Sequence, residues 1–192
     1  MKMNRLVESK DNLPRLLRHH YQGHAVVMWT LTIEHRATGW LNESFHACFR
    51  ELMLHAAVRE KVWCPTYCLM PDHVHLIWMG MRRESDQLNA MRFLRRQLAP
   101  KLNPHKFQHQ AHDHVLREDE RKRGAFARVC FYVLANPVRA KLATEGEVWP
   151  FSAAVVPGYP ALHPMAEIFG TSFGNSTWLK GIMNRWRQLF HL

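Results

Sequence analysis

The chain has 192 residues, and its hydrophobic content of 47%, with ten Phe and seven Trp, is enough for a folded core and excludes a disordered chain. Its formal net charge of +10 favours a polyanionic partner, nucleic acid first, because neutralised phosphates release their counterions. It has four scattered cysteines and no run near the roughly 20 apolar residues that span a bilayer. We therefore expect a protein of the reducing cytoplasm with no membrane partner.

The first part of the chain predicts an arm, a strand and a helix. Residues 1–22 are polar and basic, which indicates an N-terminal arm ahead of the domain. Residues 25–33 are rich in β-branched and aromatic side chains, as is typical of a strand. Between residues 41 and 61 apolar side chains recur with the helical period, so an amphipathic helix is predicted there. Asn42 is placed to cap it.

A hairpin is predicted next, and it carries two histidines. Residues 62–70 and 73–79 form its strands, and Pro71 and Asp72 form the tight turn. Because side chains alternate along a strand, His73 and His75 share one face. Two neighbouring imidazoles can hold one divalent cation and leave positions open for substrate oxygens. The same spacing also suits two ordinary strand histidines that hydrogen-bond to their neighbours.

The second half of the chain completes an alternation of strands and helices. A second amphipathic helix is predicted from about residue 85 to 102, a strand over 107–116, and a helix from about residue 119 that carries Tyr132. The order β-α-β-β-α-β predicts an α+β protein with a ferredoxin-like antiparallel sheet and helices packed on it. We place this domain at residues 23–152, followed by a C-terminal tail, residues 153–192, with a regulatory or DNA-contacting role.

The helix that carries Tyr132 presents a polar row beside its apolar stripe. Arg128, Tyr132 and Asn136 recur at intervals of four and lie at the border of the buried face. On these grounds alone Tyr132 fits a boundary tyrosine, and Asn136 fits a helix terminator before Pro137. Asp72 and Asp113 are candidates for orienting a histidine through its second nitrogen, although capping the turn suits Asp72 better.

Two motifs give this pattern a family resemblance. The segments Met70-Pro-Asp-His-Val-His-Leu76 and Tyr132-Val-Leu-Ala-Asn-Pro-Val-Arg-Ala-Lys-Leu142 closely resemble the histidine motif and the tyrosine helix of the REP-associated tyrosine transposases. These form a group within the single-tyrosine HUH transposases. Trp149-Pro-Phe-Ser152 is similar to a Trp-Pro-x-Ser segment that follows the tyrosine helix in that family. The resemblance extends over about residues 23–152.

The resemblance implies a metal-dependent endonuclease and strand transferase that acts on single-stranded DNA with palindromic hairpins, as a monomer or a homodimer. Tyr132 would be the nucleophile and would form a 5′-phosphotyrosine intermediate. His73, His75 and Asn136 would hold the divalent cation, which we expect to be Mg or Mn because reactions at phosphate favour hard ions.

Basic residues on both sides of these motifs are candidate DNA contacts. They are Arg92, Arg95, Arg96, Arg117, Arg121, Lys122, Arg123, Arg128, Arg139, Lys141, Arg185 and Arg187. Two alternatives stay open. One is a structural zinc site made of Cys64, Cys68, His73 and His75. The other is a nucleic-acid-binding module that uses the same sheet without catalysis.

Overall fold

The computed structural model describes residues 15–122 and 124–155. In chain order the elements are η1 (Arg18–Tyr21), β1 (Val26–Thr32), η2 (Glu34–Arg36), α1 (Glu43–Glu60), β2 (Val62–Met70), β3 (His73–Gly80), α2 (Gln87–Leu102), β4 (His112–Leu116), α3 (Glu118–Lys122), α4 (Ala125–Leu134), α5 (Asn136–Arg139) and β5 (Ser152–Val155). None of the helices in these two ranges is long and apolar enough to cross a bilayer.

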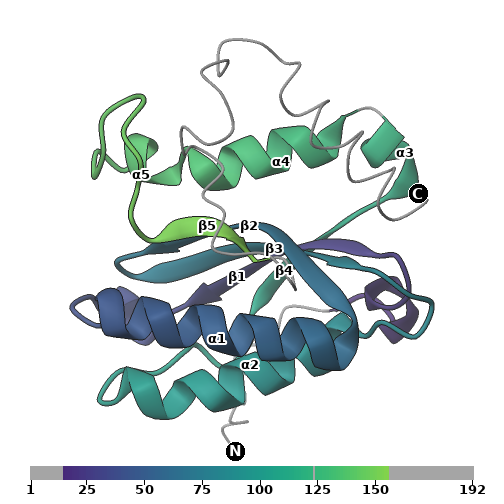
Figure 1. Ribbon diagram of the computed structural model, residues 1–192, viewed down its shortest axis with the longest axis horizontal. Helices are drawn as coiled ribbons and strands as arrows, with labels where there is room; N and C mark the ends of the chain where they lie inside the picture. The colour runs from purple at the N-terminus through teal and green to yellow at the C-terminus, as the bar shows by residue number, and fades with distance from the viewer. Residues whose placement is uncertain (1–14, 123, 156–192) are drawn as a thin grey trace, which may run out of the picture.

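The strands form one five-stranded antiparallel sheet in the order β4-β1-β3-β2-β5. Its first four strands and the helices α1 and α2 follow the predicted β-α-β-β-α-β order, which confirms the ferredoxin-like sheet. Figure 1 shows three layers, with α1 and α2 against one face of the sheet and α4 against the other. The central strand is β3, which therefore lies between two helical layers.

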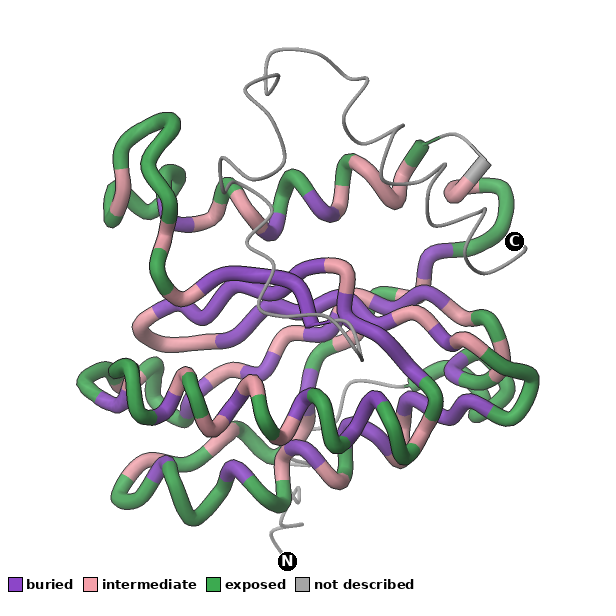
Figure 2. The backbone as a smooth tube through the Cα atoms, viewed as in Figure 1, coloured by how far each residue is buried: buried purple, intermediate pink, exposed green. Residues whose placement is uncertain are grey.

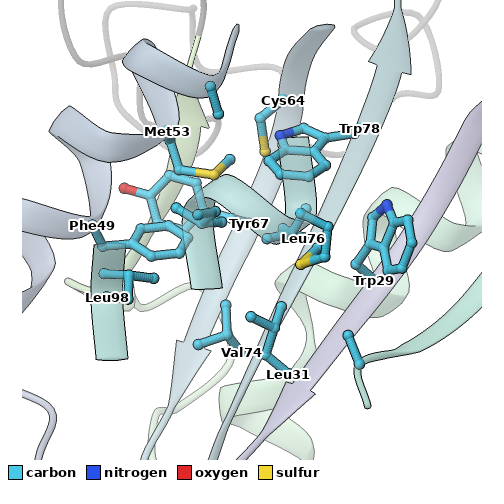
Figure 3. Close-up of a cluster of buried hydrophobic side chains, with 14 of the residues drawn as sticks. Trp29, Leu31, Phe49, Met53, Cys64, Tyr67, Val74, Leu76, Trp78 and Leu98 are labelled. Atoms are coloured by element: carbon cyan, nitrogen blue, oxygen red, sulfur yellow. The ribbon is translucent and has the colours of Figure 1, made fainter. Parts of the chain in front are cut away.

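The alternation of β3 divides its side chains between two apolar clusters. Leu76 and Trp78 belong to the larger cluster, which fills the space between the sheet and the helices α1 and α2 together with Phe49 and Leu98 (Figure 3). Ile77 belongs to a smaller cluster beneath α4. Strands β2, β3 and β5 are buried almost throughout, whereas the outer faces of the helices are exposed (Figure 2). His73 and His75 alternate along β3 with the residues of the larger cluster, so their side chains face the α4 layer.

Side-chain caps fix where the two long helices begin. The side chain of Asn42 accepts a hydrogen bond from the backbone N–H of Phe45 at 2.9 Å, which confirms the predicted cap of α1. Asp86 does the same for α2, accepting from the N–H of Asn89 at 3.0 Å. For this reason α2 begins at Gln87, two residues later than predicted.

Two predicted elements differ from the structure. The strand predicted over 107–116 begins only at His112, because the Arg95 guanidinium binds the carbonyl oxygens of Gln108 and His109 and holds that stretch as a loop. The single helix predicted from residue 119 is divided into α3 and α4. The division falls at Gly124, whose φ of 76° is left-handed and incompatible with a continuing α-helix.

Residues on both sides of the predicted domain limits pack on the sheet. Tyr21, within the predicted arm, is fully buried, and its hydroxyl donates to Asp113 Oδ2 at 2.6 Å. Strand β5 extends three residues past Ser152 and pairs with β2. The indole N–H of Trp149 donates to the Leu69 carbonyl oxygen at 2.8 Å, so the Trp-Pro-x-Ser segment anchors the chain where it returns to the sheet.

Candidate functional site

The two histidines open strand β3 and lie ring to ring on the α4 side of the sheet. Their ring centroids are 4.6 Å apart, and the two Nε2 atoms are 3.1 Å apart. His75 is buried, with 7% of its surface exposed, and His73 is partly exposed. The sequence prediction that both histidines share one face is confirmed.

Each imidazole is held through its other nitrogen. His73 Nδ1 lies 2.6 Å from Asp72 Oδ1, and His75 Nδ1 lies 2.9 Å from Thr30 Oγ1, on the residue that faces His75 across the β1–β3 ladder. A carboxylate only accepts hydrogen bonds, so Nδ1 of His73 carries the hydrogen and its Nε2 offers a lone pair. Asp72 therefore orients a histidine. From the sequence alone, turn capping is the better-supported role for this residue. Asp113 instead accepts from Tyr21.

This arrangement of nitrogens fits a shared cation. With hydrogen on Nδ1 of both rings, the two Nε2 lone pairs face each other at 3.1 Å and can share a cation, whereas with hydrogen on Nε2 of His75 the same contact is a hydrogen bond to His73. The separation is less than twice a metal–nitrogen bond of about 2.1 Å, so one ion can bind both atoms. Within residues 15–122 and 124–155 no third His, Cys, Asp or Glu completes a cluster with them. The pair therefore leaves coordination positions open.

Burial and the neighbouring charges keep His75 neutral. Burial first, and then His73, Arg36 and Arg139, lower the pKa of His75 to about 4, while Asp72 acts in the opposite direction. Arg36 Nε forms an ion pair with Asp72 Oδ2 at 2.7 Å. At neutral pH the imidazole of His75 is therefore unprotonated, which is the form that binds a metal.

Tyr132 lies directly beside this pair. Its ring centroid is 5.9 Å from that of His75, at an interplanar angle of 67°, and 42% of the residue is exposed. The Arg139 guanidinium lies 4.6 Å from the Tyr132 ring centroid. Helix α4 holds the tyrosine there because Cys130 and Val133 are buried in the smaller apolar cluster. The sequence motifs that carry Tyr132 and the histidines thus converge in space.

Asn136 is joined to this group through the backbone of α4. Its Nδ2 donates to the carbonyl oxygen of Tyr132 at 2.8 Å and to that of Val133 at 3.4 Å. These bonds use the amide nitrogen, so Oδ1 is the atom of this side chain suited to a cation. Its place as a third ligand stays a prediction.

The alternative of a zinc site is wrong. Although Cys64 and Cys68 are four residues apart on β2, the register shift between Trp63 and Thr66 places them in different apolar clusters, on opposite faces of the sheet. Cys64 therefore cannot join the other three proposed ligands. Burial also raises the pKa of the Cys68 thiol to about 12, which disfavours the thiolate that zinc needs.

Several basic residues predicted to contact DNA share the histidines' side of the sheet. The group within the layer of α3, α4 and α5 (Figure 1) consists of Arg121, Lys122, Arg128 and Arg139, whereas Arg117 follows β4 and Lys141 follows α5. Of these, Arg139 contacts Tyr132. Arg123, Arg185 and Arg187, with the predicted tail beyond residue 155, lie outside the described residues. Whether these side chains contact DNA stays a prediction.

The three arginines predicted on the second helix lie elsewhere. Arg92, Arg95 and Arg96 belong to α2, which covers the opposite face of the sheet from the histidines (Figure 1). Arg95 binds loop carbonyls and lies 5.8 Å from the Phe107 ring centroid, so it serves the fold. These arginines do not adjoin the candidate site.

Two residues of the site were not identified from the sequence. Thr30 depends on the register of β1 against β3, and Arg36 depends on the path of the loop after β1, and neither is visible in a pattern of residue types. The alternation of β1 does place Thr30 and Thr32 on the face opposite Trp29 and Leu31. That signal indicated the face of Thr30 but not its partner.

Comparison with known proteins shows a likeness of fold. No family model matches the chain, and no curated protein matches it. Among solved structures, the chain is similar to a REP-associated tyrosine transposase bound to a REP hairpin, with a TM-score of 0.60 and 19% sequence identity over 73% of this chain and 81% of that chain. This likeness is one of fold, and the solved structure belongs to the family that the two sequence motifs resemble.

Proposed function

We propose that this protein cleaves and rejoins single-stranded DNA at palindromic hairpins, with Tyr132 as the nucleophile. The observation that carries the proposal is the contact between the Tyr132 and His75 rings, 5.9 Å apart, beside a histidine pair suited to one cation. The net charge of +10 supports a nucleic-acid partner. The solved transposase of similar fold is bound to a REP hairpin, which supports the choice of a hairpin.

In the proposed cleavage, the phenolic oxygen of Tyr132 attacks a backbone phosphorus. An Oη–P bond forms, the bond from phosphorus to the 3′ oxygen breaks, and the phenolic proton is lost to solvent while the leaving 3′ oxygen gains one. The products are a 5′-phosphotyrosine and a free 3′-hydroxyl. Because the phosphodiester energy is retained in the covalent link, attack by a 3′-hydroxyl reverses the step and rejoins the strand.

The other residues of the site prepare the phosphate for this attack. The Nε2 atoms of His73 and His75, with Oδ1 of Asn136, would hold a Mg or Mn ion, which when bound supplies Lewis-acid polarisation of the phosphate oxygens. Asp72 and Thr30 keep the imidazoles oriented for that purpose. Arg139, stacked on Tyr132, adds positive charge where the phosphate would lie.

The test is the formation of a covalent adduct. A labelled hairpin with single-stranded flanks is incubated with the protein and Mn²⁺, and the mixture is separated under denaturing conditions. Tyr132→Phe should abolish both the shifted adduct and strand cleavage, because the attacking oxygen is removed, and should retain hairpin binding. Tyr67→Phe is the matched control, since that hydroxyl is buried against His46 in the other cluster, and it should leave the adduct intact.

Other outcomes separate the proposal from its alternative. Cleavage by Tyr132→Phe would refute the role of the tyrosine. If the unaltered protein binds the hairpin but forms no adduct in Mn²⁺ or Mg²⁺, the non-catalytic nucleic-acid-binding module is the better description.

A further inference from the structure

Arg36 occupies a constrained position next to the histidine pair. It lies in the loop after β1, where His35 and Arg36 both have left-handed backbones, with φ of 57° and 55°. Residues other than glycine adopt this conformation when their surroundings enforce it, and such positions gather at functional sites. Here the backbone N–H of Ile33 donates to the Asp72 carbonyl oxygen at 3.0 Å, so the loop is fastened to the turn that precedes His73.

Among the described residues, the guanidinium of Arg36 is held at one edge only. Its Nε pairs with Asp72 Oδ2 at 2.7 Å, while Oδ1 of the same carboxylate binds His73. The Arg36 side chain is 60% exposed and that of Asp72 is 21% exposed, so the anchored end is covered and much of the cation faces solvent. A guanidinium has five donors, and the pairing through Nε leaves the donors of its two Nη atoms for another acceptor.

The balance of charge at the site favours an anion as that acceptor. Arg36 and Arg139 both lower the pKa of His75, so both cations lie near the imidazole pair. Within residues 15–122 and 124–155, Asp72 is the one carboxylate that raises the same pKa. Around the histidines, two guanidinium groups are therefore opposed by one carboxylate, before any metal binds.

We propose that Arg36 binds a backbone phosphate of the DNA strand that enters the histidine pair. The ligand class is a phosphodiester, whose two non-bridging oxygens suit the planar fork of a guanidinium. Asp72 then has two roles, because it anchors Arg36 and orients His73, and the anchored side chain loses less freedom when the phosphate binds. The inference rests on the proposed function, which supplies the strand.

The test measures how hairpin affinity depends on salt. Fluorescence anisotropy follows a labelled hairpin with single-stranded flanks, in EDTA and in a Tyr132→Phe background so that cleavage does not interfere. Arg36→Gln should weaken binding and reduce the slope of log K against log salt by about 0.7, the value for one single-strand phosphate contact. Arg36→Lys should restore the slope, because the charge returns, without restoring the full affinity. Arg83→Gln is the matched control, since Arg83 is exposed and follows the far end of β3, and should change neither quantity.

A second measurement separates contact with phosphate from a role in positioning alone. Mn²⁺ binding to the DNA-free protein, followed by electron paramagnetic resonance, should be as tight or tighter in Arg36→Gln, because a neighbouring cation is removed. Weaker Mn²⁺ binding with an unchanged salt slope would overturn the proposal, since Arg36 would then act only through Asp72.

Two further outcomes separate this inference from the proposed function. If the wild type binds the hairpin and Arg36→Gln has the same affinity and salt slope as Arg83→Gln, this inference alone is overturned. A wild type that binds no hairpin would overturn the proposed function as well. If Arg36→Gln does not fold, Arg36→Lys decides the question, and loss of slope in that variant contradicts the proposal.

Discussion

The orientation of His73 depends on the carboxylate of Asp72. The Nδ1–Oδ1 distance of 2.6 Å is that of a strong, charge-assisted hydrogen bond, which fixes the tautomer and raises the basicity of the opposite nitrogen. We expect Asp72→Asn to lower Mn²⁺ affinity about 10-fold to 100-fold, as the loss of such a partner does at known metal sites. Isothermal titration calorimetry of the DNA-free protein measures this directly.

Asp113→Asn is the control for that variant. It removes another carboxylate of the same sheet, one that accepts from Tyr21 and pairs with Arg15, and it should leave Mn²⁺ affinity unchanged. An Asp72→Asn protein that binds Mn²⁺ as tightly as the unaltered chain would show that Asp72 only caps the turn.

At this scale the sequence predicted the positions of the proposed reacting groups better than those of the residues that support them. His73, His75 and Tyr132 stand in motifs, and strand alternation and helical period place each on a defined face. Thr30 and Arg36 became partners of the site through the β1–β3 register and through a left-handed loop. Neither property follows from residue spacing, because register and loop path are set by packing across the whole sheet.

The placement of Tyr132 depends on how α4 is seated. Val133 is fully buried in the smaller cluster with Cys68 and Ile77, next to Tyr132 in the chain. Val133→Ala removes two methyl groups and should lower the free energy of unfolding by about 2 kcal/mol, which corresponds to a fall in melting temperature of about 4 to 8 °C. Adduct formation should fall with it, because the tyrosine is less firmly positioned.

Val138→Ala is the matched control in α5. Val138 is 37% exposed, so the same substitution removes little buried area and should change the melting temperature by no more than about 2 °C. Equal losses in the two variants would mean that α4 does not depend on Val133 for its position.

Up to residue 102, the helices and strands of the structure agree closely with those predicted from the sequence. Both long helices have apolar stripes and side-chain caps, and the hairpin strands alternate around a turn with Pro71, so local patterns and tertiary packing agree. The later elements are shorter and depend on single features. Gly124 divides a helical pattern, and β5 forms because β2 offers an edge and Trp149 anchors the return. Neither the division at Gly124 nor the formation of β5 produces a periodic pattern of apolar residues in the sequence.

The stability of the whole molecule should reveal the neutral histidine at its centre. In the folded protein burial, with help from His73, Arg36 and Arg139, lowers the pKa of His75 to about 4. In the unfolded chain an imidazole has a pKa near 6.5. Between these values the unfolded state binds one more proton, so stability falls as pH falls. The contribution is fully present above pH 6.5 and is lost progressively toward pH 4.

The size of this effect is set by the same two values. The difference between 6.5 and about 4, at about 1.4 kcal/mol for each pH unit, corresponds to about 3 kcal/mol. Urea unfolding in EDTA at pH values from 4 to 7 measures it as a slope. His75→Gln should reduce the slope of the free energy of unfolding against pH by about the contribution of one proton. His55→Gln, at an exposed position on α1, should leave that slope unchanged. If His75→Gln retained the full acid dependence of the unaltered chain, the proton taken up on unfolding would belong to other groups. The pKa of His75 in the folded protein would then lie close to the unfolded value near 6.5, and burial would not be what keeps this imidazole neutral.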